Sequence, residues 1–387
     1  MKISVMGTGY VGLVSGTCLA ERGHQVTCID IRSEVVQEIN AGRPPIHEIG
    51  LDNLLRSARD KGMLSATTDA KTAILDSDVT LICVGTPTVD GRMDMSQIVA
   101  AAKEIGSALA CKRGYHVVAV KSTVLPGTTE GPVKAAIESH SGKKVGDCWG
   151  LCMNPEFLRE GRAVEDFRVP DRIVVGSTDS MTAEVFLKVY ADFTCPKLVT
   201  TPRTAEMIKY VSNSLLATMI SFSNEIGNMC SAVPGVDARL VWKGVHLDRR
   251  LTPINGQVGG AAGVTEYLWH GLGFGGSCFP KDVAALRSFG RTVGEQTRML
   301  DAVLDINTDQ PLRMVALLEK ELSLAGKTVA VLGLAFKPGT DDLRESPALP
   351  LVAELRKKGA KVLVHDPIAM PHAKKRPEFR DVVFAED

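Results

Sequence analysis

Residues 271–282, GLGFGGSCFPKD, combine a thiol, a lysine and a carboxylate within one short stretch. The four glycines of this stretch allow a backbone to pass close to a ligand. Cys278 stands just before Pro280, which suits the first turn of a helix, and a helix N-terminus with Lys281 nearby would stabilise a thiolate. Asp282, one helical turn after the cysteine, could serve as a base toward water. A buried structural cysteine is the alternative, but the concentration of reactive groups favours a covalent catalyst.

Lys209 and Asn213 form a second group of reactive residues. Their spacing of four residues places the ammonium and the amide on one face of a predicted helix. A lysine beside a reacting hydroxyl can stabilise the developing alkoxide or polarise a carbonyl. A lysine on a helix is usually a solvated surface residue, but the neighbouring Met207, Ile208 and Val211 are apolar, which predicts a largely buried helix.

Further polar groups stand in three loops that follow predicted strands: CVGTP at 83–87, KSTVLPG at 121–127 and NPEFLREG at 154–161. Open α/β sheets bind their ligands at such strand ends. The third loop carries two glutamates and an arginine, and a solvated capping loop is the alternative for it. A fourth segment, AFKPGTDDLRESP at 335–347, contains Lys337 and Arg344 ahead of a predicted helix. These cations could cradle a diphosphate, although a charged surface loop with a serine N-cap would have the same pattern.

The segment GTGYVG, which starts at Gly7, matches the GxGxxG pattern of dinucleotide-binding folds. It follows a predicted strand and opens a predicted helix, and Asp30 stands at the end of the next strand. In this arrangement Gly7 makes the tight turn, Gly9 admits the pyrophosphate, and Gly12 allows close helix–strand packing. Asp30 would accept hydrogen bonds from ribose hydroxyls and repel a 2′-phosphate. NAD is therefore favoured over NADP, although the nearby Arg32 weakens this inference.

The first half of the chain alternates short β-rich runs with amphipathic helical patterns, which predicts βαβ units and a mostly parallel sheet. The expected strands are residues 3–6, 25–29, 79–84, 116–120 and 172–175, and the expected helices are residues 11–22, 96–109 and 128–140. Residues 205–233 then predict one long helix, with Gly227 as a candidate break. Helical patterns return over 280–324, where the DQP step at 309–311 is expected to begin the last segment. A second βαβ pattern spans 327–365.

The composition is that of an ordinary globular protein, with 44% hydrophobic and 23% charged residues over 387 positions, enough for two or three domains. Zero formal net charge argues against recruitment to nucleic acid or a membrane surface through bulk charge. The apolar runs are too short to span a bilayer, and the chain opens directly into a strand pattern, so no signal peptide is expected. The nine cysteines favour reduced thiols in the cytoplasm, and Cys148 and Cys152 lack the companions of a metal site.

Taken together, these segments resemble the nucleotide-sugar 6-dehydrogenases, the family of UDP-glucose and GDP-mannose dehydrogenases. The resemblance runs from Met1 to about Asp366 with the segments in family order, and GGSCFPKD and FKPGTDDLRESP are its most specific strings. It implies two successive NAD-dependent oxidations, from alcohol to aldehyde to acid. In this chemistry the cysteine holds the substrate as a thiohemiacetal and then as a thioester, which water hydrolyses.

The resemblance also implies a set of site residues. Cys278 would be the nucleophile, Lys209 and Asn213 would stabilise the oxyanion, and Asp282 would assist proton transfer. The remaining catalytic residues, around a water molecule, would be Thr123 and Glu160. The implied cofactor-binding residues are Gly7, Gly9, Tyr10, Val11, Gly12, Asp30, Arg32, Thr86, Thr123, Glu160, Lys281 and Arg344. The implied substrate-binding residues are Glu156, Phe157, Leu158, Arg159, Glu160, Lys209, Asn213, Tyr267, Gly271, Gly275 and Lys337.

The choice of sugar rests on the stretch GRAVEDF at 161–167, which continues to Arg172. It is closer to the UDP-glucose enzymes than to the GDP-mannose enzymes, so oxidation of UDP-glucose to UDP-glucuronate is expected. GDP-mannose 6-dehydrogenase and UDP-N-acetylhexosamine 6-dehydrogenase are the alternatives, and a non-catalytic sugar-nucleotide-binding protein is an alternative of another class. Intact Cys278, Lys209 and Asp282 argue against a loss of catalysis.

Three features depart from the family pattern. Many relatives have a lysine or arginine near the adenosine ribose where this chain has Val35, so Arg32 is expected to substitute. The segment before Gly271 is longer than in most relatives, so either Arg249 or Arg250 could be the arginine that reaches the neighbouring subunit's site. Family chains also continue well past the segment that ends the sequence.

The expected architecture is an α/β fold of three parts. Residues 1–200 are predicted to form an NAD-binding Rossmann domain, and residues 201–310 a central helical dimerisation region that contains the long helix and the catalytic cysteine. Residues 311–387 are predicted to form a shortened Rossmann-like lobe for the sugar nucleotide. With two or three strands this lobe would leave an unpaired sheet edge, so it is expected to be incomplete. The protein is also expected to be a cytoplasmic homodimer that serves polysaccharide biosynthesis. No metal site is expected.

Overall fold

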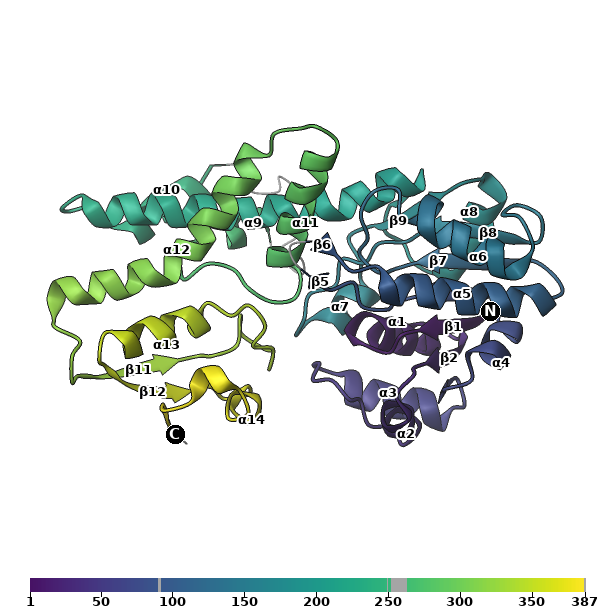
Figure 1. The fold of residues 1–387 in the computed structure, drawn as a ribbon, viewed down its shortest axis with the longest axis horizontal. Coiled ribbons are helices and arrows are strands. Elements are labelled where there is room, and N and C mark those ends of the chain that lie inside the picture. The colour runs from purple at the N-terminus through teal and green to yellow at the C-terminus, as the bar shows by residue number, and fades with distance from the viewer. Residues whose placement is uncertain (90–91, 249, 252–262, 386–387) are drawn as a thin grey trace. The chain divides into compact units, whose positions relative to one another are not determined.

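The computed structural model describes residues 1–89, 92–248, 250–251 and 263–385. The chain folds as two compact units, Met1–Tyr210 and Val211–Asp387, called unit 1 and unit 2 below (Figure 1). The boundary falls inside one helix, α9 (Pro202–Ala232), which contributes residues to both units.

Unit 1 is built around an eight-stranded sheet with the order β10-β9-β8-β7-β4-β1-β2-β3. Its strands are β1 (Lys2–Met6), β2 (Gln25–Ile29), β3 (Leu64–Thr67), β4 (Val79–Ile82), β7 (His116–Val120), β8 (Trp149–Met153), β9 (Ile173–Ser177) and β10 (Lys197–Thr200), and a separate hairpin pairs β5 (Thr88–Val89) with β6 (Arg92–Met93). Neighbouring strands of the sheet are parallel except β8 with β9. The chain passes from β1 to β2 on one side and continues with β4 on the other side of β1. Ligands bind open α/β sheets at such a topological switch point, beyond the C-terminal strand ends.

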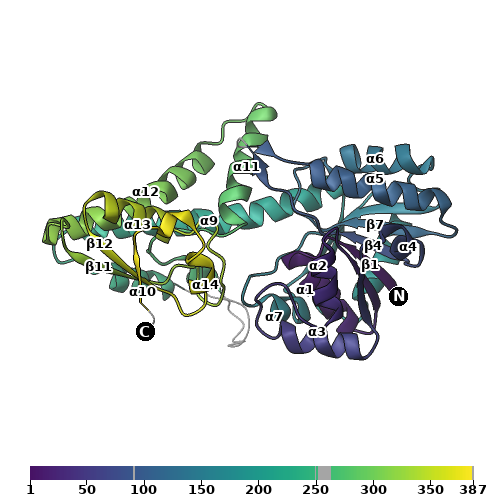
Figure 2. The same cartoon turned by 60° about the horizontal axis from the view of Figure 1, so that its bottom comes forward.

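Helices cover both faces of this sheet (Figure 2). One face packs against α1 (Tyr10–Glu21), α2 (Ser33–Asn40), α3 (Leu51–Asp60), α7 (Ala163–Arg168) and α8 (Ser180–Leu187). The other face packs against α4 (Ala70–Leu75), α5 (Ser96–Cys111) and α6 (Lys134–Ser141). Adjacent residues of β1 go to opposite faces, with Val5 in the first hydrophobic cluster and Met6 in the second. Because both faces are covered, the strands read as nearly continuous apolar runs.

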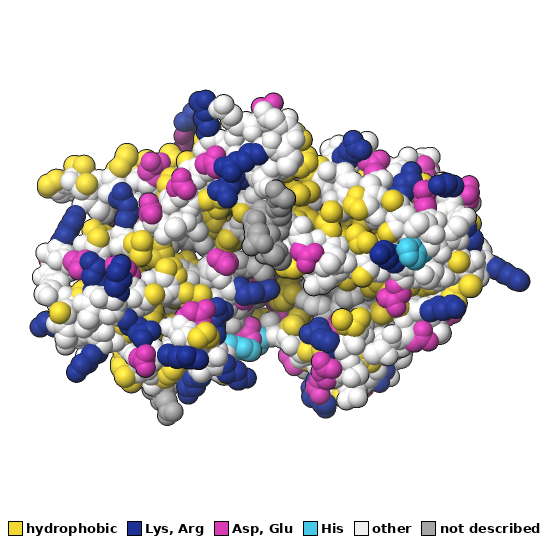
Figure 3. Space-filling view, viewed as in Figure 1, with side chains coloured by type: hydrophobic (Ala, Val, Ile, Leu, Met, Phe, Trp, Pro, Cys, Tyr) yellow, Lys and Arg dark blue, Asp and Glu magenta, His cyan; other side chains and the backbone are white. Residues whose placement is uncertain are grey.

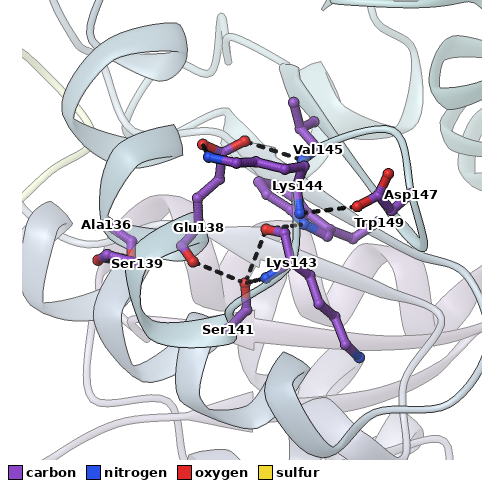
Figure 4. Close-up of polar contacts among 9 residues, drawn as sticks. All are labelled: Ala136, Glu138, Ser139, Ser141, Lys143, Lys144, Val145, Asp147 and Trp149. Carbon is purple, nitrogen blue, oxygen red and sulfur yellow. Dashed lines mark hydrogen bonds and ion pairs between the residues drawn. The ribbon is translucent and has the colours of Figure 1, made fainter.

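The connection from α6 to β8 is closed by its own polar side chains (Figure 4). The Val145 N–H and the Lys144 ammonium donate to the Glu138 carboxylate at 3.2 and 3.1 Å. Trp149, the first residue of β8, donates from its indole to the Lys143 carbonyl at 3.4 Å. These contacts hold the start of β8, and the opposite end of that strand leads into the NPEFLREG loop.

Unit 2 continues α9 and adds a group of helices and a small sheet. The elements are α10 (Ala238–His246), α11 (Phe279–Thr292), α12 (Arg298–Glu321), β11 (Thr328–Leu332), α13 (Ala348–Lys357), β12 (Lys361–His365), α14 (Met370–Ala373) and β13 (Val383–Phe384). The sheet is parallel with the order β11-β12-β13, and α12 and α13 supply apolar side chains to its core. Figure 1 shows α13 lying along β11 and β12. β11 is an edge strand, and Leu332 at its end is 78% exposed.

The α/β fold class is confirmed, and most expected elements are present with ends shifted by one or two residues. The predicted break in the long helix is wrong, because α9 continues through Gly227. A Cβ on Gly227 would lie 2.5 Å from the Cβ of His270. That glycine permits close packing rather than a bend. The last helical segment begins at Arg298, and Pro311 lies inside α12. The helix expected at 128–140 begins with a π-helical turn, Thr129–Val133.

The described residues lack two kinds of feature. No helix there is long and apolar enough to cross a membrane. No group of three or more His, Cys, Asp or Glu side chains there could hold a metal ion. Cys152 is buried in β8, and burial raises the pKa of its thiol above the usual range.

Candidate functional site

The glycines of the GTGYVG segment have separate roles at the C-terminal end of β1. Gly7 has φ +92°, and a Cβ there would lie 2.9 Å from the carbonyl oxygen of Cys83. A Cβ on Gly12 would lie 1.9 Å from the Gly7 oxygen, so α1 packs against the turn only because this residue has no side chain. At Gly9 an added Cβ would meet nothing within 4 Å, so open space lies at the helix N-terminus. This tight turn and open approach fit a dinucleotide pyrophosphate.

Asp30 follows β2 and is 7% exposed. Its carboxylate accepts hydrogen bonds from the backbone N–H and the hydroxyl of Thr8, and from the Arg32 guanidinium at 3.0 and 3.2 Å. Burial disfavours the ionised form, but the bonds from Arg32 and Thr8 outweigh burial and lower the pKa of Asp30 to about 2. The Arg32 side chain is 53% exposed. An exposed arginine loses little by moving, so ribose hydroxyls can replace it, while its charge reduces the repulsion of a 2′-phosphate.

The loops that follow β4, β7 and β8 are linked to one another. Thr86 Oγ1 donates to the Thr123 carbonyl at 2.8 Å, which joins the first two loops. Lys121 is 4% exposed, and its ammonium donates to Asn154 Oδ1 at 2.9 Å, which joins the second loop to the third. The Tyr190 hydroxyl donates to the same Asn154 oxygen at 2.7 Å. The Lys121 ammonium also donates to the Tyr190 oxygen at 3.5 Å. Burial lowers the pKa of Lys121, and the Asn154 and Tyr190 oxygens replace the water that its ammonium loses.

The third loop meets α9 through a buried ion pair. Lys209 Nζ donates to Glu156 Oε1 at 2.9 Å, and the two side chains are 4% and 6% exposed. The Leu158 N–H donates to the other carboxylate oxygen at 2.7 Å. Burial opposes ionisation of Glu156, but Lys209 and the Leu158 N–H together lower its pKa. The Phe157 ring centroid lies 5.5 Å from Lys209 Nζ and 3.9 Å from the Arg172 guanidinium, so the lysine stands beside an aromatic face.

In unit 2, Cys278 is the N-cap residue of α11, and Pro280 stands in the first turn of that helix as expected. The loop before the cysteine is held by α12. The Phe274 N–H donates to Asn307 Oδ1 at 2.7 Å, and Asn307 Nδ2 donates back to the Phe274 carbonyl at 3.0 Å. Gly273 has φ +107°, and a Cβ there would lie 2.5 Å from the same Asn307 oxygen. The loop therefore approaches α12 too closely for a side chain at this glycine.

The other side of the cysteine loop packs against the AFKPGTDDLRESP segment. The Gly276 N–H donates to the Arg344 carbonyl at 2.8 Å. A Cβ on Gly275 would lie 2.2 Å from the Glu345 carbonyl oxygen, and a Cβ on Gly276 would lie 2.7 Å from the Phe336 ring. Glu345 itself has φ +52°, a left-handed conformation that non-glycine residues rarely adopt. The glycine pair before the cysteine is thus required by the close approach of a distant segment.

Asp282 lies one helical turn after Cys278, and its N–H donates to the Cys278 carbonyl at 2.8 Å. The carboxylate is 1% exposed and accepts from Asn213 Nδ2 at 2.6 Å and from Lys281 Nζ at 2.5 Å. The sequence predicts positive charge from Lys281 beside the thiol, whereas the structure directs this ammonium to Asp282. The amide of Asn213 and the carboxylate of Asp282 are therefore aligned with each other next to the cysteine's helix.

The two cations expected to cradle a diphosphate lie on the segment that contacts the cysteine loop. Lys337 Nζ lies 5.6 Å from the Phe336 ring centroid. Arg344 makes a bidentate pair with Asp342, with Nε and Nη2 donating at 2.9 and 2.7 Å, and its side chain is 60% exposed. An exposed pair of this kind contributes little stability, so the guanidinium can turn toward a phosphate at low cost.

The structure places the predicted site residues in two groups. Unit 1 contains Gly7, Gly9, Tyr10, Val11, Gly12, Asp30, Arg32, Thr86, Thr123, Glu156, Phe157, Leu158, Arg159, Glu160 and Lys209, and unit 2 contains Asn213, Tyr267, Gly271, Gly275, Cys278, Lys281, Asp282, Lys337 and Arg344. Arg159 pairs with Asp166 of α7 at 2.6 Å, and the exposed Arg250 pairs with Asp248 at 2.5 Å. Arg249 lies outside the described residues.

Sequence reasoning missed residues that hold the loops. The Gly271 N–H donates to Asn224 Oδ1 at 2.7 Å, and Gln310 Nε2 donates to the Gly271 carbonyl at 2.8 Å. Asn224 had a detectable signal, because it follows Asn213 on α9 by about three helical turns and so shares its face. Gln310 and Asn307 had no such signal in the sequence, because polar residues at exposed and buried positions of α12 look alike there.

Three models of the UDP-glucose/GDP-mannose dehydrogenase family match the chain: the NAD binding domain at residues 1–194, the central domain at 203–309 and the UDP binding domain at 330–387. A UDP-glucose 6-dehydrogenase of Haloferax volcanii is 44% identical over 393 residues, which covers 100% of this chain and 87% of that protein. A GDP-mannose 6-dehydrogenase of Pseudomonas aeruginosa is 41% identical over 367 residues, which covers 95% of this chain and 81% of that protein.

A solved structure supports the same relationship. The UDP-glucose dehydrogenase from the hyperthermophilic archaeon Pyrobaculum islandicum superposes with a TM-score of 0.91 at 44% identity, covering 100% of this chain and 86% of that one. The matched NAD binding domain contains the glycine turn and Asp30, so NAD is the cofactor. The chain belongs to the UDP-glucose/GDP-mannose dehydrogenase family and is an NAD-dependent oxidoreductase of nucleotide sugars.

Proposed function

We propose that this dehydrogenase oxidises UDP-glucose to UDP-glucuronate, a four-electron reaction at the terminal hydroxymethyl carbon. The observation that carries the proposal is the position of Cys278 at the N-cap of α11, in a loop held from both sides. Oxidation of an alcohol to an aldehyde needs no cysteine. Oxidation of the aldehyde to an acid does need a nucleophile that converts it into a hydride donor, and a thiolate at a helix N-terminus can act in this way.

The proposed steps assign one task to each reactive residue. The Lys209 ammonium stabilises the alkoxide that forms when the hydroxymethyl group loses its proton to water, and loss of a first hydride from this alkoxide gives the aldehyde. The Cys278 thiolate then adds to the aldehyde carbon, and the amide of Asn213 stabilises the oxyanion of the resulting thiohemiacetal. Loss of a second hydride yields the thioester. Water, deprotonated by Asp282, attacks the thioester carbon, which releases the carboxylic acid and restores the thiolate.

Cofactor and substrate are assigned to the same residues that the sequence predicted. When bound, NAD accepts one hydride ion in each oxidation. We propose that it is held by Gly7, Gly9, Tyr10, Val11, Gly12, Asp30, Arg32, Thr86, Thr123, Glu160, Lys281 and Arg344. We propose that the sugar nucleotide is held by Glu156, Phe157, Leu158, Arg159, Glu160, Lys209, Asn213, Tyr267, Gly271, Gly275 and Lys337, with Thr123 and Glu160 also placing the attacking water.

The choice of UDP-glucose rests on the relatives. The Haloferax volcanii protein at 44% identity and the Pyrobaculum islandicum structure both carry the UDP-glucose name. GDP-mannose is the second candidate, because the Pseudomonas aeruginosa protein is 41% identical over nearly the whole chain. The difference in identity is small, so kinetics must decide between the two sugar nucleotides.

We also propose that the chain forms a homodimer through an apolar face of α9 and α10. Val211, Leu215, Phe222 and Met229 recur at helical spacing along α9, and each is about half exposed, between 50 and 53%. Leu240 of α10 is 63% exposed, and Figure 3 shows apolar side chains where Figure 1 places these helices. A twofold axis lets such a stripe cover its own copy. Sedimentation should detect a dimer, and Phe222→Asp should shift it toward the monomer; a wild-type monomer would contradict the proposal.

A cytoplasmic location and a role in supplying sugar acids for polysaccharide synthesis are part of the same proposal. Cys18, Cys28 and Cys83 are buried thiols, and burial raises the pKa of each to about 12. Buried, reduced thiols are typical of proteins in a reducing compartment. The division into parts at 1–200, 201–310 and 311–387 also stays a prediction.

The test is a substrate screen with NAD. The purified chain is mixed with UDP-glucose, GDP-mannose or a UDP-N-acetylhexosamine, while NADH is followed by absorbance and the product by mass spectrometry. We expect the highest kcat/KM with UDP-glucose and two NADH per sugar nucleotide, with little free aldehyde, because the thiohemiacetal retains it. A higher kcat/KM with GDP-mannose would transfer the proposal to that substrate. One NADH with accumulating aldehyde would remove the cysteine step, and binding without NADH would indicate a non-catalytic protein.

A further inference from the structure

Glu48 is a buried carboxylate in the connection between α2 and α3, and it is only 1% exposed. The N–H of Gly161 donates to one of its oxygens at 2.7 Å, and the N–H of Ala163 donates to the other at 2.8 Å. The Tyr10 hydroxyl also donates to this carboxylate and accepts from the Gly161 N–H at 3.0 Å. Three donors from two distant segments therefore converge on one side chain.

The two segments held by Glu48 are both parts of the site. Tyr10 is the first residue of α1 and belongs to the GTGYVG turn. Gly161 directly follows Glu160, and Ala163 is the first residue of α7. Helices α1, α3 and α7 share one hydrophobic cluster on the same face of the sheet (Figure 2). Glu48 thus bridges the turn that receives the dinucleotide and the loop that carries Glu160.

The Glu160 loop depends on this bridge for its position. Gly161 has φ +82°, and α7 has only six residues, so neither provides a stable anchor of its own. The N-cap residue Arg162 makes no side-chain capping hydrogen bond to α7. Glu48, which lies outside α7, instead accepts the Ala163 N–H at the start of that helix. A carboxylate at a helix N-terminus is favoured by the helix dipole.

We propose that Glu48 is a positioning residue, which orients Glu160 and couples the placement of that residue to the dinucleotide turn. This inference rests on the role proposed above for Glu160. Only a carboxylate can satisfy the donors, because each of its two oxygens offers lone pairs and neither carries a hydrogen. A glutamine would keep one acceptor oxygen and would direct its NH₂ group against an N–H or O–H donor, so the loop must shift.

The experiment compares Glu48→Gln, Glu160→Gln and the double variant in NADH production with UDP-glucose. We expect Glu48→Gln to lower kcat about 10- to 100-fold, as expected for a misplaced reactive group. The double variant should be no slower than Glu160→Gln alone, because both changes remove the same contribution. Losses that multiply would show that Glu48 acts independently of Glu160 and would overturn the proposal, as would an unchanged kcat with lowered thermal stability.

Asp179→Asn is the matched control. Asp179 caps α8 by accepting the Thr182 N–H at 2.7 Å. It follows β9, which runs antiparallel to β8, so the chain after β9 leads toward the start of β8 and away from the strand ends that bear the site. This variant should lose some thermal stability and keep the wild-type kcat. Where Glu48→Gln is too unstable to purify, Tyr10→Phe removes one donor and leaves both backbone bonds, and the same cycle with Glu160→Gln should again be non-additive.

Amide hydrogen exchange separates failure of this inference from failure of the proposed reaction. Residues 158–163 should exchange about tenfold faster in Glu48→Gln than in wild type, and Asp179→Asn should leave them unchanged. This measurement needs no substrate, so it decides on the bridge even if UDP-glucose is not oxidised. Equal exchange in wild type and Glu48→Gln would overturn the inference whatever the substrate is.

Discussion

The strand-end loops of unit 1 and the cysteine loop of unit 2 are held in different ways. In unit 1 several polar residues directly follow a strand whose ladder of backbone hydrogen bonds sets their position, as with Asp30 after β2 and Asn154 after β8. The loop before Cys278 belongs to no sheet. Its backbone is held by single side chains, Asn224 of α9 and Asn307 and Gln310 of α12, and by one carbonyl of the C-terminal segment.

This difference concerns how support is distributed. In a sheet, many backbone hydrogen bonds share the task of holding a strand, so no single side chain determines where the strand ends. The cysteine loop is held by a few side-chain contacts, and each of these contacts can be removed by one substitution. Substitutions remote from the sulfur should therefore affect catalysis in unit 2, whereas in unit 1 the large effects should come from buried charges, whether they touch the substrate, as proposed for Lys209, or hold a loop, as proposed for Glu48.

Cys278→Ala should have the largest effect. Without the sulfur no thiohemiacetal can form, so acid production should fall by at least about 10³-fold. Cys278→Ser should stall as an ester that mass spectrometry detects as added mass on the protein. The alanine variant should retain its fold and its affinity for NAD, measured by calorimetry. Acid production at the wild-type rate by that variant would contradict the covalent mechanism.

Among substitutions in unit 1, Lys209→Met should have the largest effect, and this effect is on the free energy of unfolding. It leaves Glu156 as a buried unpaired charge, which should cost about 3–5 kcal/mol in the free energy of unfolding, whereas Lys209→Met with Glu156→Gln should cost much less. In wild type the pKa of Glu156 is lowered, so its contribution is present above its unfolded pKa and is lost as the pH falls through the folded value. The deficit of the single variant should therefore shrink below about pH 5, where denaturant unfolding can measure it. A constant deficit would mean that lost packing, not charge, is responsible.

Asn307→Ala tests the side-chain support of the cysteine loop directly. It removes both bonds to Phe274 but none of the proposed reactive side chains, so kcat should fall about tenfold through displacement of the loop. Thr308→Ala on the same helix is the control, because among the described residues the Thr308 hydroxyl donates only to the Leu304 carbonyl of its own helix. If both variants keep the wild-type kcat, the loop is held by its backbone and the contrast between the two regions is lost.

Asp30→Asn should give the smallest change. Wild type should prefer NAD, because the Asp30 carboxylate, with a pKa of about 2, is ionised at neutral pH and disfavours a 2′-phosphate. Arg32 already neutralises part of that charge, so the variant should reduce the ratio of kcat/KM for NAD over NADP only several-fold, by roughly 3- to 10-fold. Steady-state kinetics with both cofactors measure it. Equal kcat/KM in wild type would show that Arg32 overrides Asp30.

The sequence predicted the βαβ pattern, the glycine turn, Asp30 at a strand end and Cys278 at the start of a helix, because these features depend on local spacing. Glycines at fixed offsets, apolar runs of strand length and a proline after the cysteine have the same meaning in almost any fold. The break at Gly227 was not predicted correctly, because a glycine that admits His270 looks the same in the sequence as one that bends a helix. The pairing of Lys281 with Asp282 is also a matter of side-chain direction, which spacing does not set.

The sequence by itself determined which residues could react and in which element each would stand, because backbone propensity and hydrophobic period are local properties. Only the tertiary structure decided which polar residues support them. Glu48 reaches Gly161, and Asn307 reaches Phe274, across separations that carry no period or motif. Such contacts arise when packing brings buried donors next to buried acceptors that must be satisfied. That requirement becomes visible only once the chain has folded.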